Sequence, residues 1–141
     1  MLSIHNRIIV LLTFLLIFNT SAFANDSDVV NCNKSWKIAI LGSSTAFGTG
    51  ATSYDSSWVG KFTSYIKRRN SQNTIYNLAI PGFTSYQNLR PTGYTPPAGR
   101  PSPDAAYNIT AALALFPDAI IINMPSNDAA NLYSLAEQQD N

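Results

Sequence analysis

Three short apolar segments, each followed by turn-forming residues, constrain the fold of this chain more than any other feature. The segments hold almost continuous runs of apolar, β-branched or aromatic residues, a pattern typical of strands that are covered on both faces in a parallel sheet. They comprise residues 37–41, 74–80 and 119–124. We therefore expect three buried parallel strands.

The segments around the expected strands carry helical patterns. Residues 58–69 place apolar side chains three and four positions apart on one helix face, and Ser57 is expected to cap this helix. Composition and spacing also predict helices over residues 105–116, capped by Asp104, and over residues 129–138. Two segments are expected to be loops, the glycine- and hydroxyl-rich residues 45–57 and the proline-rich residues 90–103. The alternation of strands and helices predicts a doubly wound α/β layer.

The first 24 residues have the pattern of a secretory signal peptide. A short, positively charged start precedes an almost unbroken apolar run over residues 8–18, and Ala22-Phe23-Ala24 has the form that signal peptidase cleaves. A membrane anchor is the alternative, but it needs about 20 apolar residues. We therefore expect cleavage after Ala24, a secreted or periplasmic product without a stable membrane anchor, and a lead-in segment over residues 25–36.

The mature chain is electrically balanced. Removing the signal takes away Arg7 and leaves eight basic and eight acidic side chains, which argues against a nucleic-acid partner. The one basic run, residues 67–69, lies at the end of an expected helix, where it is favourable with the helix dipole. Cys32 is the single cysteine, so no internal disulfide can form, and its position excludes a lipid anchor at the first mature residue. A free thiol and a partner outside the 141 residues both stay open.

Ser44, Gly82 and Asn127 each follow the end of an expected strand. Right-handed crossovers bring the carboxyl ends of parallel strands to one edge of the sheet, so these residues are expected to face one crevice. A serine nucleophile that attacks an acyl carbon needs donors for the developing oxyanion, and a backbone N–H, a glycine N–H and an asparagine amide can supply them. Each residue also has a purely structural interpretation, as a helix cap or as a source of positive φ.

The sequence around these positions resembles the first three blocks of the SGNH (GDSL-type) hydrolase family. The matching segments are Gly42-Ser43-Ser44-Thr45 with Gly48, Asn77-Leu78-Ala79-Ile80-Pro81-Gly82, and Ser126-Asn127-Asp128. The resemblance covers residues 38–131 and implies that Ser44 is the catalytic nucleophile, with Ser44, Gly82 and Asn127 as the oxyanion hole. It implies a three-layer α/β/α domain of flavodoxin-like architecture over residues 37–141. The implied substrate is an acyl or acetyl ester of a carbohydrate or lipid.

Departures from the family pattern bear on activity. Ser43 stands where the family commonly has aspartate, and Pro125 stands where it commonly has glycine. The family's base is a histidine in a fourth block, whereas the single histidine here is His5, within the expected signal peptide. A serine without a base is a poor nucleophile, so we expect little turnover. We interpret the chain as the amino-terminal part of a longer protein, incomplete at its C-terminus and poorly stable or prone to associate through an unpaired sheet edge, in preference to a complete protein that has lost its base.

Other classes of protein fit the sequence less well. The glycine-rich segment after residue 41 lacks the G-K-[ST] ending of a P-loop, and Ala46 breaks the G-x-S-x-G pattern of a nucleophile elbow. No cofactor or metal is expected, because the mature chain has no histidine and its carboxylates are scattered. The alternative is a non-catalytic secreted module that binds a carbohydrate or an acyl group. Its candidate lining residues are Trp36, Tyr54, Trp58, Phe83, Tyr86 and Tyr94.

Overall fold

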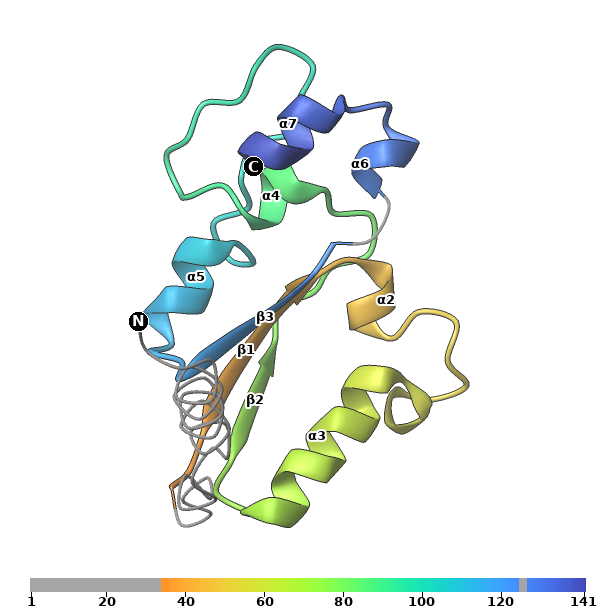
Figure 1. The fold of residues 1–141 in the computed structure, drawn as a ribbon, viewed down its shortest axis with the longest axis vertical. Coiled ribbons are helices and arrows are strands. Elements are labelled where there is room, and N and C mark those ends of the chain that lie inside the picture. The colour runs from red at the N-terminus through yellow and green to blue at the C-terminus, as the bar shows by residue number, and fades with distance from the viewer. Residues whose placement is uncertain (1–33, 125–126) are drawn as a thin grey trace, which may run out of the picture. The chain divides into compact units, whose positions relative to one another are not determined.

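The computed structural model describes residues 34–124 and 127–141, which include a three-stranded parallel sheet (Figure 1). The strands are β1 (Lys37–Gly42), β2 (Thr74–Asn77) and β3 (Ala119–Asn123), in the order β2-β1-β3. The prediction of an α/β fold with three parallel strands is therefore confirmed. The expected signal peptide, its cleavage site and Cys32 lie outside the described residues.

The register aligns the carboxyl ends of the three strands at one edge of the sheet. Ile40 of β1 pairs with Asn77, the last residue of β2, and Gly42 pairs with Asn123, the last residue of β3. The alignment continues beyond β2, because the Ile80 N–H donates to the Gly42 carbonyl at 3.2 Å. The turn that follows β2 therefore lies beside the turn that follows β1.

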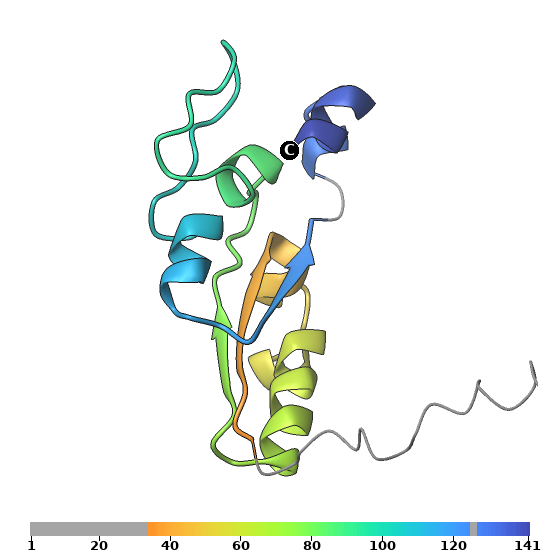
Figure 2. The same cartoon turned by 60° about the vertical axis from the view of Figure 1, so that its left-hand side comes forward.

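Alternate residues of β1 pack against different helices. Ile40 lies in a cluster with Val59 of α3 (Trp58–Arg69), whereas Ala39 and Leu41 lie in a second cluster with Ala112 of α5 (Ile109–Ala114). Since neighbouring side chains of a strand point to opposite faces, α3 and α5 cover opposite faces of the sheet, as Figure 2 shows. The helix predicted over residues 58–69 and its Ser57 cap are confirmed, the Ser57 Oγ accepting from the Gly60 N–H.

Three short helical elements interrupt segments that were not expected to be helical. The expected loop over residues 45–57 contains α2 (Ser44–Phe47) and the 3₁₀ helix η1 (Tyr54–Ser56). The turn after β2 leads into α4 (Ser85–Asn88), which begins with a capping box between Thr84 and Gln87. The T-x-x-Q spacing was the sequence signal for α4. Residues 90–103 contain no helix or strand, as expected.

The last two predicted helices have wrong boundaries. The helix expected from residue 105 begins at Ile109, because the Asn108 side chain caps it, whereas Asp104 accepts from the Ala106 N–H in the preceding turn. The helix expected over residues 129–138 is two helices, α6 (Asn127–Ala130) and α7 (Leu135–Asp140). Leu132 separates them with a φ of +57°, a conformation that no helix continues through.

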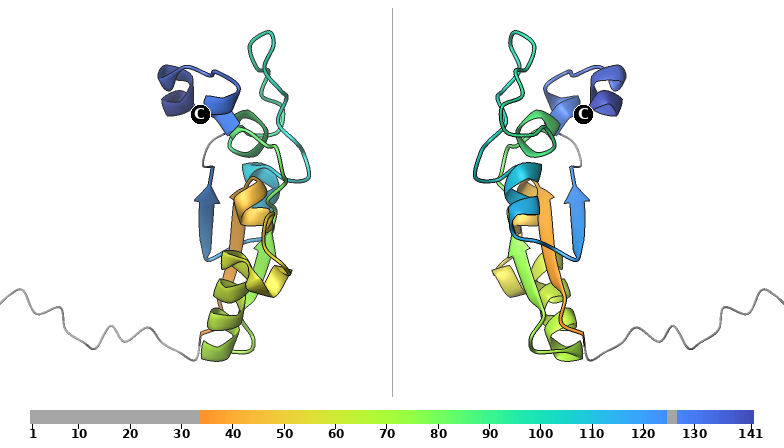
Figure 3. Two further views of the ribbon diagram at one scale, coloured as in Figure 1. Left: turned by 90° about the vertical axis from the view of Figure 1, so that its right-hand side faces the viewer. Right: turned by 90° about the vertical axis from the view of Figure 1, so that its left-hand side faces the viewer.

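The expectation that all three strands are buried is correct for β1 alone. Residues 38–42 are buried, but β3 pairs with β1 on one side and with no other described strand, and its Ile122 is 52% exposed. Beyond the carboxyl ends of the strands lie α4, α6 and α7, which Figure 3 shows gathered at the same end of the sheet. These helices border the edge at which the site was predicted.

Candidate functional site

Ser44 is the first residue of α2, directly after β1 and the buried Ser43. The first N–H groups of a helix have no partner within the helix. The Ser44 N–H donates to no residue of the described chain, and neither does its hydroxyl. Ser44 therefore has a backbone donor at the end of β1 that is unpaired within residues 34–124 and 127–141.

Gly82 lies in a tight turn that follows β2. The Phe83 N–H donates to the Ile80 carbonyl at 3.2 Å, and Gly82 has a φ of +86°, as expected for the third residue of a type II turn that begins Ile80-Pro81. In this turn the closing hydrogen bond uses the Phe83 N–H and leaves the Gly82 N–H free. No acceptor for the Gly82 N–H lies in residues 34–124 or 127–141.

Asn127 begins α6 and contacts the Gly82 turn directly. Its side-chain amide donates to the Phe83 carbonyl at 2.8 Å. An asparagine amide has two hydrogens, so one remains for a second acceptor. The interpretation of Asn127 as a simple helix cap does not account for this contact, because the amide binds the turn after β2.

The structure thus brings the predicted residues to one edge of the sheet. The chain after Gly82 is bound by Asn127, and the chain before it is bound to Gly42, two residues before Ser44. Pro125 falls outside the described residues, so its effect on the start of α6 stays a prediction. The roles of Ser44, Gly82 and Asn127 as nucleophile and oxyanion donors likewise stay predictions.

Asn77 supports the site in a way that the sequence did not reveal. Its amide donates to the Ala46 carbonyl of α2 at 2.9 Å, while its side-chain oxygen accepts from the Ala79 N–H at 3.1 Å. One side chain therefore fastens the end of β2 to the helix that begins at Ser44. Its position in the second family-like block was the available signal.

Asp128 is a buried carboxylate behind the Gly82 turn. Both of its oxygens lie 3.2 Å from the Ser85 nitrogen, whose N–H they accept, and Oδ1 also accepts from the Ser85 hydroxyl. Asn141 in turn donates to that hydroxyl at 2.7 Å. We refer to Ser85, Asp128 and Asn141 as the Ser85 triplet. No role was expected for these residues from the sequence.

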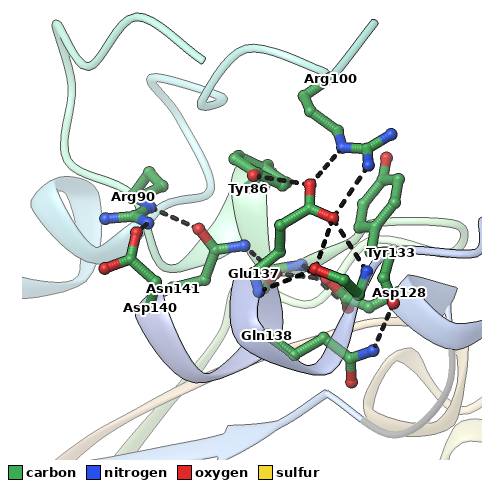
Figure 4. A network of polar contacts seen from close by, with 11 residues as sticks. Tyr86, Arg90, Arg100, Asp128, Tyr133, Glu137, Gln138, Asp140 and Asn141 are labelled. Atoms are coloured by element: carbon green, nitrogen blue, oxygen red, sulfur yellow. Dashed lines mark hydrogen bonds and ion pairs between the residues drawn. The ribbon is translucent and has the colours of Figure 1, made fainter. Parts of the chain in front are cut away.

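A second set of polar contacts fastens α7 to the proline-rich loop (Figure 4). Glu137 accepts from Arg100 at 2.6 and 3.0 Å, from the Tyr86 hydroxyl at 3.2 Å and from Ser134. The Arg100 hydrogen bonds, followed by that from the Ser134 N–H, lower the pKa of Glu137 from 4.5 to about 2. Burial raises the pKa of Tyr86, and the hydrogen bond to Glu137 raises it further. We refer to Tyr86, Arg100, Ser134 and Glu137 as the Glu137 cluster.

A cavity of about 510 Å³ opens beside the last residue of α2, Phe47, whereas Ser44 is the first residue of that helix. It is lined by residues 47–51, Ser53, Tyr54 and Asn77. Of the six aromatic residues proposed to line a binding site, this cavity includes Tyr54 alone. Trp58 instead packs against the β1–α3 core, and Tyr86 and Tyr94 stack with ring centroids 6.4 Å apart.

The described part of the chain contains no group of three or more metal-binding side chains. None of its helices has both the length and the apolar character needed to cross a bilayer. Residues 34–124 and 127–141 contain no histidine that could accept the proton of a serine nucleophile. Among the described residues, the edge of the sheet thus offers hydrogen-bond donors without a histidine base.

Comparisons with known proteins give no match. No family model matches the chain, and no curated protein or solved structure matches it significantly. The likeness to SGNH hydrolases therefore depends on the three sequence blocks, and the functional argument depends on the geometry of the site.

Proposed function

We propose that the chain carries the nucleophile and oxyanion hole of a secreted serine esterase of the SGNH type, with its three-layer, flavodoxin-like architecture. The observation that carries the proposal is the set of donors at one edge of the sheet. Two backbone N–H groups, of Ser44 and Gly82, are unpaired within the described residues, and the Asn127 amide binds the same turn. Ser44 is half-buried and Gly82 is exposed, so both N–H groups are open to a ligand at this edge, and such donors suit an oxygen that becomes negative during reaction.

In the proposed reaction Ser44 Oγ attacks the carbonyl carbon of an ester of a carbohydrate or lipid. A base takes the hydroxyl proton as the tetrahedral intermediate forms, and returns it to the alcohol oxygen as the C–O bond to the alcohol breaks. The Ser44 and Gly82 N–H groups and the Asn127 amide hold the oxyanion, and water later releases the acid. Because residues 25–141 contain no histidine, the proposal takes its base from outside them.

Acylation of Ser44 at alkaline pH tests the proposal on the chain as it stands. Hydroxide can replace the missing base, and an oxyanion hole without its base retains about 10³–10⁴-fold catalysis over water. We expect p-nitrophenyl acetate to acetylate the chain at a rate that rises with hydroxide concentration. The acetyl-serine should accumulate, because p-nitrophenolate leaves far more readily than a serine alkoxide, so acetylation outpaces hydroxide attack on the acetyl-serine.

Two variants identify the reacting hydroxyl. Ser44→Ala should abolish the hydroxyl acetylation, whereas Thr45→Ala, which removes the next hydroxyl of the same short helix, should leave it unchanged. Equal acetylation of wild type and Ser44→Ala would contradict the proposal.

The alternative, a binding module without catalysis, is supported by the cavity beside α2. Phe47 and Tyr54 line it and are each about half exposed, and both could stack on a sugar ring. A module of this kind predicts saccharide binding that Tyr54→Ala abolishes and Ser44→Ala does not change. The esterase proposal predicts that Ser44→Ala removes acylation, whether or not the chain binds a saccharide.

A further inference from the structure

We infer that Asp128 is a positioning residue that aligns the oxyanion donors of Gly82 and Asn127 with each other. The inference rests on the proposed esterase function. It assigns a role in that function to a residue that does not itself bind the oxyanion. Asp128 is 6% exposed and belongs to the Ser85 triplet.

Two consecutive residues of α6 bind the chain on both sides of Thr84. Asn127 binds the Phe83 carbonyl and Asp128 binds the Ser85 N–H and hydroxyl. Gly82 immediately precedes this bound segment. The Ile80–Gly42 hydrogen bond holds the chain before the turn, and the pair of contacts from α6 holds the chain after it. Without the Asp128 contact, the Asn127 amide alone would align the Gly82 side of the turn with α6.

The chemistry of the triplet requires an acceptor at position 128. Asn141 donates to the Ser85 hydroxyl, so the hydroxyl hydrogen is directed to Asp128, and the Ser85 N–H is directed there as well. A carboxylate accepts both hydrogens with its two oxygens. An asparagine at this position would bring an NH₂ group into a site that already holds two donors, and an alanine would leave both donors buried without a partner.

Saturation kinetics of Ser44 acetylation at alkaline pH separate positioning from substrate binding. We expect Asp128→Asn to lower the limiting acetylation rate by about 10²-fold, the effect of misplacing a reacting geometry by roughly 1 Å, with an unchanged half-saturating concentration. Ser85→Ala keeps the backbone N–H and removes the hydroxyl, so it should lower the limiting rate in the same direction but less. Asn131→Ala is the control. It also removes a hydrogen bond from α6, but that bond joins the Asn131 amide to the Asn127 main-chain carbonyl on the exposed side of the helix, so the limiting rate should not change.

The two proposals fail in different ways. If wild type is not acetylated at Ser44, the esterase proposal fails and the role of Asp128 fails with it. If wild type is acetylated and both folded variants, Asp128→Asn and Ser85→Ala, react at its limiting rate, the esterase proposal stands and the positioning role is wrong. A rise in half-saturating concentration with an unchanged limiting rate would also overturn the positioning role. Should Asp128→Asn not fold by circular dichroism, Ser85→Ala decides alone.

Discussion

The turns at the strand ends have backbone donors without acceptors among the described residues, whereas the helices beyond these turns are held by many hydrogen bonds. At the strand ends the N–H groups of Ser44 and Gly82 donate to none of the residues that the structure describes. Behind them, Ser85 alone makes three side-chain contacts and Glu137 accepts from three residues. This difference shows how such an edge can be built. Backbone donors can stay available for a ligand where side chains of neighbouring helices bind the same segment of backbone and fix its position.

Replacing Asn127 removes a donor and also a support, and it should have the largest effect on acylation. Asn127→Ala is expected to slow Ser44 acetylation by about 10²–10³-fold, the usual loss for one oxyanion donor. The lost bond to the Phe83 carbonyl should lower the free energy of unfolding by about 1 kcal/mol. Acetylation kinetics and urea unfolding measure the two effects. Acetylation at the wild-type rate would remove Asn127 from the site.

Two glycines with similar positive φ angles separate strain from function. Gly82 and Gly99 have φ values of +86° and +80°, and an added Cβ would meet nothing within 4 Å at either position. Alanine at each should cost about 1–2 kcal/mol of stability, because the left-handed conformation disfavours a Cβ. Gly82→Ala should also slow acetylation by about 10-fold or more as its N–H moves, and Gly99→Ala should not. Equal acetylation rates would show that the Gly82 N–H takes no part.

The Glu137 cluster should affect acid stability and leave the reaction unchanged. Glu137 is ionised in the folded state down to about pH 2 and in the unfolded chain down to about its ordinary value of 4.5. Its contribution is therefore present above pH 4.5 and lost as pH falls through 2. Glu137→Gln should lower the urea midpoint near neutral pH and converge with wild type near pH 2.

Asp140→Asn is the matched control on the same helix. Its carboxylate pairs with Arg90 but is 80% exposed, and exposed ion pairs contribute little. The urea midpoint of this variant should therefore follow that of wild type at every pH. A shift in Asp140→Asn as large as that in Glu137→Gln would contradict the account of the cluster.

The sequence predicted the elements whose stabilisation is local. The helix Trp58–Arg69 is correct to the residue because a capping serine directly precedes it and its apolar residues form one face. The three strands were found because their apolar runs are almost continuous, but the second ends at Asn77, three residues before the expected end at residue 80. The prediction of one helix over residues 129–138 was wrong because Leu132 adopts a positive φ, and the Tyr133 N–H donates to the Asp128 carbonyl in place of a helical acceptor.

The candidate site was predicted only in part, for a physical reason. Ser44, Gly82 and Asn127 could be proposed from their places after strands, since topology brings parallel strand ends together. The contact of Asn77 with α2 spans 31 residues of chain and that of Ser85 with Asp128 spans 43, so no local pattern in the sequence pairs these groups. The exposure of Ile122 was missed because an apolar run does not tell a central strand from an edge strand.

Locating the acetyl group after reaction with p-nitrophenyl acetate tests the central claim most directly. Proteolysis and mass spectrometry of the 141-residue chain, after a short exposure at alkaline pH, distinguish Ser44 from its neighbours and from exposed lysines such as Lys61 and Lys67. The account predicts that Ser44 is the principal hydroxyl modified and that Ser43 and Thr45 are not. Acetyl groups confined to lysines, or spread equally over the hydroxyls of residues 43–45, would contradict it.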